Sequence, residues 1–301
     1  MKKLNSILSV LVLICLLSSC ADAQSTKTAI DKVTSQGKTL SKEVTKMTNK
    51  DKAVALLKSI ETGAKEPVAY INAENYTQHN LGVADGLAGF GAVLHMAPPE
   101  GFKVKVIRSF EDGDYVFTHS EYDFFGPKAG FDIFRFENGL IVEHWDNLSA
   151  LTPANPSGRT QLDGPAKAED VDKTEANRTL VSNFITDVLM NGKADKMTDY
   201  ISTETYLQHN SGIADGLAGL GAAFKYFTDN DLVMIYEKTH AVLAQGNFVL
   251  TVSEGKFGKG DHTSFYDLFR IADGKIVEHW DVIETIMPES DRKNENGKFG
   301  F

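Results

Sequence analysis

Imidazole and carboxylate side chains recur at matching places in two long stretches of this chain. Tyr76–Gly91, "YTQHNLGVADGLAGFG", returns as Tyr206–Gly221, "YLQHNSGIADGLAGLG", with twelve of sixteen positions identical. Phe131–Asn147, "FDIFRFENGLIVEHWDN", returns as Tyr266–Val282, "YDLFRIADGKIVEHWDV", with ten of seventeen identical. Of the eight histidines, four recur in both copies: His79, His144, His209 and His279. Matches of this length indicate duplication of a whole domain.

Aspartates accompany His144 on both sides. Asp132 lies one predicted strand earlier, and Asp146 follows two residues later. A carboxylate beside an imidazole orients the ring and favours its protonated form, which suits general acid–base catalysis. Copy two repeats the set as Asp267, His279 and Asp281. The alternative is structural: Asp132 and His144 would join two strands, and Gln78–Asn80 would tie a loop to the sheet.

The hairpin that follows Phe131 decides whether these side chains share a face. A two-residue turn at Asn138-Gly139 places Asp132 opposite Trp145, whereas a three-residue loop starting at Glu137 places it opposite His144. A slip of one residue exchanges every side chain between the faces. We expect the three-residue loop, because it separates polar from apolar residues. One face then carries Asp132, Phe134, Phe136, Val142, His144 and Asp146, and the other carries Phe131, Ile133, Arg135, Ile141, Glu143 and Trp145.

Each copy places its helices before its strands. The patterns "KAVALLKSIET" and "NRTLVSNFITDVL" predict an early helix, and Asp85 and Asp215 are predicted N-caps of a later one. About four strands follow, in copy one "FKVKVIRSF", "YVFTHSEY", "FDIFRF" and "LIVEHWDNL". This order predicts an α+β fold with helices packed on one face of an antiparallel sheet.

The two repeated motifs together resemble the SnoaL-like polyketide cyclase family of the nuclear transport factor 2-like superfamily. The resemblance implies two conical domains, each a curved antiparallel sheet packed on about three helices, with an apolar pocket in each. It also implies cofactor-free acid–base chemistry on a carbonyl compound of the aldol, cyclase or isomerase type. The alternative is a non-catalytic protein of the same fold that binds a small ligand, and a third interpretation makes one domain a packing partner of the other.

The resemblance assigns roles to individual residues. Asp132 or Asp146 would be the base with His144 as its partner, and His79 would approach from the helix side as a hydrogen-bond donor to a carbonyl oxygen. The other candidates are the matching catalytic residues Asp267, His279, Asp281 and His209, and the ligand-binding residues Tyr76, Asn80, Phe134, Tyr206, Asn210 and Phe269.

We expect no cofactor and no metal. A site made of His79, His144 and Asp132 is the rival, but no close metal-binding spacing supports it. The expected partner is a small apolar or carbonyl-containing molecule. Nucleic acid is excluded as a partner because the net charge is −10 and no basic cluster stands out.

The N-terminus predicts a lipid anchor in a bacterial cell envelope, outside the cytoplasm. Two lysines precede a short apolar run that ends in "LSSC", and this resembles a lipoprotein signal in which Cys20 receives the lipid. Ordinary secretion with cleavage near Ala23 is the alternative. We expect a signal peptide at 1–19, a polar tether at 20–50, domain one at 51–151, a linker at 152–171, domain two at 172–287 and a polar tail at 288–301.

The outer face of the sheet suggests how the two domains assemble. Relatives of the resembled family commonly dimerise through this face, which here carries Phe131, Ile133 and Trp145. Because one chain already holds two such faces, we expect an intramolecular pseudo-dimer.

Overall fold

Two five-stranded sheets, one in each sequence copy, form the framework of the protein. The computed structural model describes residues 47–301, so the predicted signal peptide and the candidate lipidation site Cys20 lie outside the described residues. Among the helices in this described part, none has the length and apolar character needed to cross a membrane.

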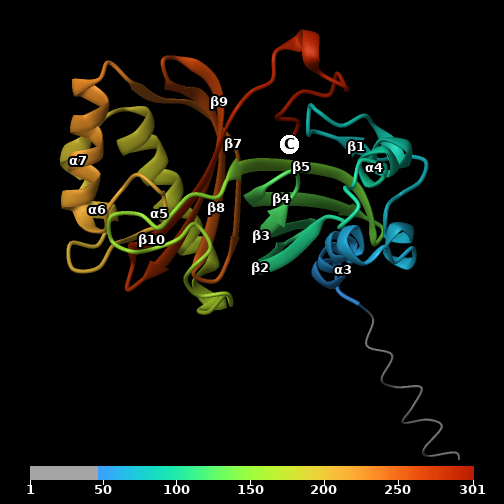
Figure 1. Cartoon of the computed structure of the whole chain (residues 1–301). Helices are drawn as coiled ribbons and strands as arrows, with labels where there is room; N and C mark the ends of the chain where they lie inside the picture. Colours follow the sequence, from blue (N-terminus) through green and yellow to red (C-terminus); the bar gives the residue numbers. More distant parts are fainter. Residues whose placement is uncertain (1–46) are drawn as a thin grey trace, which may run out of the picture. The chain divides into compact units, whose positions relative to one another are not determined.

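The first sheet has the strand order β1-β5-β4-β3-β2 (Figure 1). Its strands are β1 (Thr77–Gln78), β2 (Lys103–Asp112), β3 (Tyr115–Asp123), β4 (Pro127–Glu137) and β5 (Leu140–Ala150). All neighbours are antiparallel except β1 and β5, which are parallel. The helices of this copy are α3 (Asn49–Thr62), η1 (Glu66–Tyr70) and α4 (Gly86–His95).

The second sheet repeats that order as β6-β10-β9-β8-β7. Its strands are β6 (Leu207–Gln208), β7 (Val233–Gln245), β8 (Phe248–Gly258), β9 (Asp261–Ala272) and β10 (Lys275–Thr285). Figure 1 shows α5, α6 and α7 together on one side of this sheet. The helical segments are η2 (Val171–Lys173), α5 (Thr174–Phe184), the π-helical η3 (Ile185–Met190), η4 (Ala194–Lys196), α6 (Met197–Tyr200), α7 (Gly216–Asp229) and η5 (Glu289–Asp291). The predicted α+β class is confirmed.

Local signals in the sequence explain where α3 begins and ends. The Thr48 hydroxyl accepts a hydrogen bond from the Asp51 backbone N–H at 3.1 Å, and the Asp51 carboxylate accepts one from the Thr48 N–H at 3.0 Å. This reciprocal pair satisfies two backbone donors that a helix start leaves free. The helix ends at Thr62 and is followed by Gly63, whose φ of 69° lies in the left-handed region that glycine adopts without strain.

The predicted register of the β4–β5 hairpin is wrong, although the predicted sharing of one face by Asp132 and His144 is right. Glu137 pairs with Leu140, so the turn has two residues, Asn138 and Gly139, both with positive φ. A bulge then shifts the pairing by one residue, and Asp132 lies opposite Asp146 while Phe134 lies opposite His144.

The same bulge corrects the predicted position of Ile141. We expected its side chain on the outer face, but it packs in the inner core of copy one with Phe136. Val142 is the extra residue in β5 that has no partner on β4, and a bulge re-aims the side chains beside it. In copy two, β10 has the equivalent irregularity at Val277.

Each copy has an apolar core between its helices and its sheet, and a third cluster joins the outer faces of both sheets. Copy one contributes Phe110, Phe117, Ala129, Phe131, Ile133 and Trp145 to this third cluster, and copy two contributes Leu243, Phe248, Leu250, Val252, Tyr266, Leu268, Trp280 and Val282. All of these side chains are buried. The cluster therefore removes the apolar outer faces from water, the main source of stabilisation in such contacts.

Polar contacts also cross between the copies. The Asn147 side-chain amide donates to the carbonyl oxygens of Ser264 at 3.0 Å and Val282 at 2.9 Å. The buried Arg108 guanidinium lies 4.4 Å from the Trp280 ring centre and donates to the Asp163 carbonyl oxygen at 2.6 Å. Burial lowers the pKa of Arg108 to about 10, so it stays charged at neutral pH.

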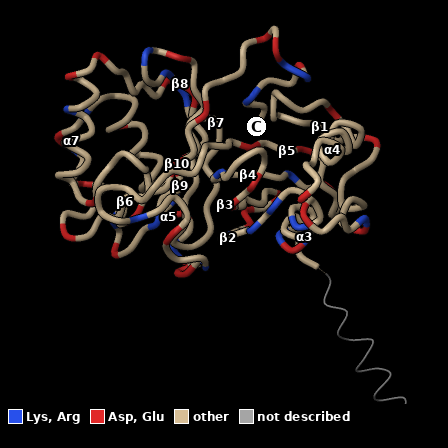
Figure 2. The backbone as a smooth tube through the Cα atoms, in the orientation of Figure 1, with Lys and Arg blue, Asp and Glu red and all other residues tan. Residues whose placement is uncertain are grey.

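Charged residues are dispersed over the described backbone. Figure 2 shows Lys and Arg interspersed with Asp and Glu rather than gathered in one stretch. Binding of a phosphate backbone needs a concentrated basic surface, and the described backbone shows no such concentration of Lys and Arg.

Candidate functional site

An aspartate–histidine pair occurs on the inner face of each sheet. His144 Nε2 lies 3.2 Å from Asp132 Oδ1, and His279 Nε2 lies 3.1 Å from Asp267 Oδ1. The aspartate comes from β4 or β9 and the histidine from β5 or β10. Each histidine ring also stacks on the phenylalanine opposite to it, with ring centres 4.8 Å apart in both copies.

The surroundings of His279 favour its protonated form. Gln208 Oε1 accepts hydrogen bonds from two backbone N–H groups, so this atom is an acceptor, and it lies 3.1 Å from His279 Nδ1. The other ring nitrogen faces the Asp267 carboxylate, and both nitrogens can therefore donate. Burial alone would lower the pKa of His279, but the Asp267 hydrogen bond and the charges of Asp281 and Asp267 outweigh it and raise the pKa above 6.5.

A tyrosine hydroxyl completes each pair, and sequence reasoning missed both tyrosines. The Tyr122 hydroxyl donates to Asp132 Oδ2 at 2.6 Å, and the Tyr236 hydroxyl donates to Asp267 Oδ2 at 3.1 Å. Both tyrosines are buried, and burial together with the neighbouring carboxylate raises their pKa values well above 10. The two hydroxyls therefore stay protonated as donors.

The two tyrosines reach equivalent carboxylates from different strands. Tyr122 lies on β3 opposite Val104 of β2, whereas Tyr236 lies on β7 opposite Gly255 of β8. A Cβ atom at Gly255 would lie 1.8 Å from the Ile235 carbonyl oxygen and 3.2 Å from the Tyr236 Cα. In copy one the tyrosine of this cross-strand pair is on the third strand, β3, whereas in copy two it is on the strand that corresponds to β2, namely β7. Aligning "HSEY" with "VSEG" hides the match, since only the strand pairing reveals it.

The second aspartate of each copy is less fully hydrogen-bonded than the first. Asp146 Oδ2 accepts from the Asn80 amide at 2.8 Å, while its Oδ1 has no hydrogen-bond partner in the described part of the chain. Asp281 accepts from the Asn210 amide at 2.8 and 3.1 Å. Burial is the main cause that raises the pKa of Asp281 above 3.8. A carboxylate with spare acceptor positions and a raised pKa can take up a proton.

A cavity of about 610 Å³ opens onto this group in copy two. Its polar end contains Asp267, His279, Asp281, Gln208, Asn210 and Tyr206. Its apolar walls include Phe184, Phe227, Phe257, Phe269, Met234 and Ile283. An apolar cavity with a few convergent polar groups is typical of a small-molecule site.

In copy one, the predicted ligand-binding residues lie around the matching Asp132–His144 pair. Tyr76 and Phe134 are buried in the inner core, and Asn80 donates to Asp146. Gln78 Oε1 lies 3.0 Å from His144 Nδ1, as Gln208 does in copy two. The glutamine of the repeated triplet is therefore a second partner of the histidine ring that the sequence did not predict.

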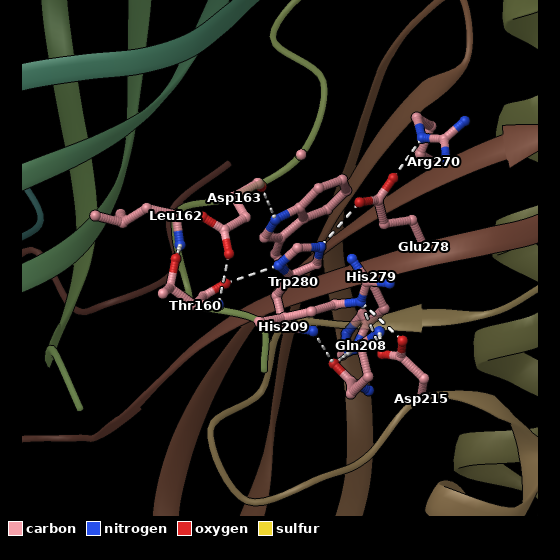
Figure 3. A network of polar contacts seen from close by, with 12 residues as sticks. Thr160, Leu162, Asp163, Gln208, His209, Asp215, Arg270, Glu278, His279 and Trp280 are labelled. Atoms are coloured by element: carbon pink, nitrogen blue, oxygen red, sulfur yellow. Dashed lines mark hydrogen bonds and ion pairs between the residues drawn. The ribbon is translucent and has the colours of Figure 1, made fainter. Parts of the chain in front are cut away.

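The placement of His79 and His209 beside the reacting group is wrong. His209 stacks on Trp280 of the outer face at 4.6 Å, and its ring nitrogens contact the Thr160 carbonyl and Glu278 at 2.7 and 2.8 Å (Figure 3). His79 stacks likewise on Trp145 at 4.6 Å. Consecutive residues of an extended segment point to opposite faces, so the glutamine faces the inner side and the histidine the outer. Both histidines therefore stack on tryptophans of the outer face.

The predicted N-cap aspartates have a different partner. Asp85 and Asp215 lie at the N-cap positions of α4 and α7, but neither side chain caps its helix. Asp85 accepts from the Gln78 backbone N–H at 2.8 Å, and Asp215 accepts from that of Gln208 at 2.9 Å. These carboxylates therefore anchor the segment that carries the glutamine.

The rival metal site that included His79 is also contradicted, because that histidine lies on the outer face. Potential ligand atoms do converge within 4.8 Å of one another in two groups: Asp132, His144 and Asp146, and Asp267, His279 and Asp281. In each group, the first carboxylate already accepts hydrogen bonds from tyrosine and histidine. We therefore interpret both groups as hydrogen-bonded networks.

Comparison with known proteins identifies one family and several solved structures of low sequence identity. The model of the SnoaL-like domain matches residues 53–144 and again residues 181–279, together more than half of the chain. No curated protein matches the chain.

Three solved structures illustrate the similarity. An NTF2-like protein of unknown function from Cytophaga hutchinsonii is 17% identical over 35% of this chain and 94% of its own, with a TM-score of 0.32. A protein of unknown function with a cystatin-like fold from Xanthomonas campestris is 21% identical over 36% and 89%, with a TM-score of 0.31. An LEH-like epoxide hydrolase from M. tuberculosis is 18% identical over 34% and 82%, with a TM-score of 0.29.

Proposed function

The chain belongs to the SnoaL-like family, in two copies, and from this premise we propose that it performs cofactor-free acid–base chemistry on a small carbonyl compound. The observation that carries the proposal is the position of Asp281. This carboxylate lines an apolar cavity beside a histidine whose pKa is raised. Acid–base catalysis needs a group with such a tuned proton affinity within reach of a bound molecule.

We infer different tasks for the two aspartates from their contacts. Asp267 is held by Tyr236 and His279 and orients the imidazole. Asp281 takes the proton from a carbon atom next to the carbonyl group, and the electron pair of that C–H bond moves towards the carbonyl oxygen. The positive charge of His279 offsets the negative charge that develops there. Protonated Asp281 then returns the proton to the same or another carbon atom.

Copy two supports this chemistry better than copy one. Lys298 Nζ lies 3.9 Å from Asp146 Oδ1, so the copy-one carboxylate has a resident cation beside it. Within residues 47–301, the Asp281 carboxylate accepts hydrogen bonds only from Asn210. We therefore assign the reacting carboxylate to Asp281.

Proton abstraction can be tested without knowing the substrate. A panel of apolar ketones is incubated in D₂O with the protein, and exchange of their α-protons is followed by NMR. We expect exchange to be lost in Asp281→Asn and retained in the matched variant Asp146→Asn. Exchange that survives in Asp281→Asn would contradict the assignment.

A non-catalytic ligand carrier is the second candidate. It is favoured by the apolar walls of the cavity, since the affinity of such a pocket requires no reaction. Titration calorimetry with the same ketones separates the two functions. Tight binding without α-proton exchange for every ketone bound would favour the carrier.

We also propose that the protein is anchored in a bacterial envelope by a lipid on Cys20. The support is the sequence "LSSC" after a short apolar run. A thioether-linked lipid adds membrane affinity for every buried CH₂ group. We expect Cys20→Ser to block lipidation and release the protein from the membrane fraction, and unchanged fractionation would refute the anchor.

An intramolecular pseudo-dimer is the assembly that we propose. The support is the apolar cluster shared by the outer faces of the two sheets, which leaves neither face free for another chain. The peptide connection raises the effective concentration of one copy near the other to about millimolar.

A further inference from the structure

A short segment follows each sequence copy, and the two segments share a pattern. "NPSGR" at Asn155–Arg159 lies in the predicted linker, and "NENGK" at Asn294–Lys298 lies in the predicted polar tail. We call residues 155–164 the linker arm and residues 294–301 the C-terminal arm. Their glycines, Gly158 and Gly297, have matching φ values of 81° and 76°. The two arms therefore share a short asparagine–glycine pattern and a left-handed backbone turn at the glycine.

The linker arm follows copy one but binds copy two. The Asn155 amide donates to the carbonyl oxygens of Gln208 at 2.7 Å and Ile213 at 2.9 Å. The Thr160 carbonyl oxygen accepts from His209 Nδ1 at 2.7 Å, and Figure 3 shows this contact beside Trp280.

The C-terminal arm follows copy two but binds copy one. The Asn294 amide donates to the carbonyl oxygens of Asn80 and Val83, each at 2.8 Å. The Gly297 carbonyl oxygen accepts from His79 Nδ1 at 2.8 Å. Figure 1 shows this last part of the chain next to β1, β5 and α4 of copy one. Each arm thus contacts the triplet-bearing loop of the copy that it does not follow, and the contacts to Ile213 and Val83 are made at matching positions of the two loops.

Both arms contact the loop that carries the Gln-His-Asn triplet. In copy two, Gln208 contacts the His279 ring and Asn210 holds Asp281. In copy one, Gln78 and Asn80 do the same for His144 and Asp146. A buried carbonyl oxygen without a hydrogen-bond donor is costly. The side-chain amide of the arm's asparagine therefore stabilises the loop conformation in which it can donate to two of the loop's carbonyl oxygens at once. The arm of one copy therefore fixes a loop in the other copy that touches the site.

We propose that the arms are reciprocal positioning elements, in which Asn155 positions the site of copy two and Asn294 positions the site of copy one. Each site is then complete only when the other copy supplies its arm. The proposal relies on the proposed function only in calling these groups a site. Its test measures the rings directly and needs no turnover.

The experiment uses the full chain with ¹⁵N-labelled histidine and compares Asn155→Ala with Asn294→Ala. We expect Asn294→Ala to shift the ring signals of His144 and leave those of His279 in place. We expect Asn155→Ala to do the reverse and also to lower the pKa of His279, because a displaced Gln208 no longer accepts its Nδ1–H. Asn191→Ala, at an exposed asparagine outside both arms, is the matched control and should move neither ring.

The crossed pattern distinguishes positioning from a general loss of stability. Both rings shifting equally in each variant, or neither ring shifting, would overturn the proposal. If an alanine variant does not fold, Asn155→Ser or Asn294→Ser replaces it, since serine can still accept the hydrogen bond within the arm but is too short to bridge both carbonyl oxygens. If the wild-type protein catalyses no α-proton exchange, that result counts against the proposed function alone. The ring shifts remain a valid test of the arms.

Discussion

The Asp267–His279 pair shows how two opposing effects set one protonation state. Burial favours neutral imidazole, whereas the adjacent carboxylates favour imidazolium and prevail. Because the folded pKa is raised above 6.5, the pair stabilises the protein fully below that pH, and this contribution is lost as the pH rises through the folded pKa.

Replacing Asp267 by Asn tests whether the Asp267 carboxylate raises the pKa of His279. The change nearly keeps the shape of the side chain but removes the negative charge, so we predict a lower pKa for His279. Histidine NMR titration measures it, and the exposed aspartate variant Asp261→Asn is the control. An unaltered His279 titration curve in Asp267→Asn would mean that the carboxylate does not set the protonation state.

The tyrosine hydroxyl on that carboxylate gives a second prediction. Tyr236→Phe removes a donor from a buried acceptor, and we expect the free energy of unfolding to fall by about 1–3 kcal/mol. Tyr226→Phe is the control because Tyr226 is 59% exposed. Chemical denaturation of both variants provides the measurement, and equal stabilities would show that the hydroxyl contributes nothing.

The sequence predicted some of these residues and not others, for physical reasons. Asp132 and His144 could be grouped because both repeat and share a strand periodicity. His79 repeats equally well, yet repetition cannot distinguish a ring that faces the site from one that stacks on Trp145. Tyr236 could not be found by comparing the copies, because its counterpart lies on a neighbouring strand.

At the scale of elements, the hairpins of the two sheets show how two irregularities combine. A two-residue turn alone would have placed Asp132 and His144 on opposite faces. The bulge at Val142 restores the shared face. The sequence left the two-residue turn at Asn138-Gly139 open, but we expected the three-residue loop instead. It carried no clear signal for the bulge at Val142, which depends on packing against neighbouring strands.

The positive φ of Gly139 in the β4–β5 turn leads to a prediction about stability. Gly139 has a φ of 76°, and an added Cβ would lie 3.1 Å from Lys52 Nζ. We expect Gly139→Ala to lower the free energy of unfolding by about 1 kcal/mol, because alanine is strained at positive φ. Gly91→Ala, inside α4 with nothing within 4 Å of the added Cβ, should raise it by about 0.5–1 kcal/mol. Thermal denaturation giving both variants the same sign would contradict the assigned turn.

At the scale of the whole molecule, the outer faces of the two sheets determine assembly. Since these faces share one buried apolar cluster, we predict that a soluble chain of residues 47–301 is monomeric at micromolar concentration. Static light scattering measures its mass. A mass of two chains would show that another apolar surface joins the molecules.

The central claim is that Asp281 removes a proton while His279 remains positively charged, and the pH dependence of α-proton exchange tests it most directly. The rate of exchange should rise with pH as Asp281 loses its proton, at a pH above 3.8 because the pKa of Asp281 is raised. It should fall again as His279 loses its proton, at a pH above 6.5 because the pKa of His279 is also raised. In Asp267→Asn, the alkaline limb should move to lower pH while the acid limb persists. A bell-shaped profile that responds in this way is the predicted result. Exchange that is independent of pH, or an alkaline limb that Asp267→Asn leaves in place, would contradict the claim.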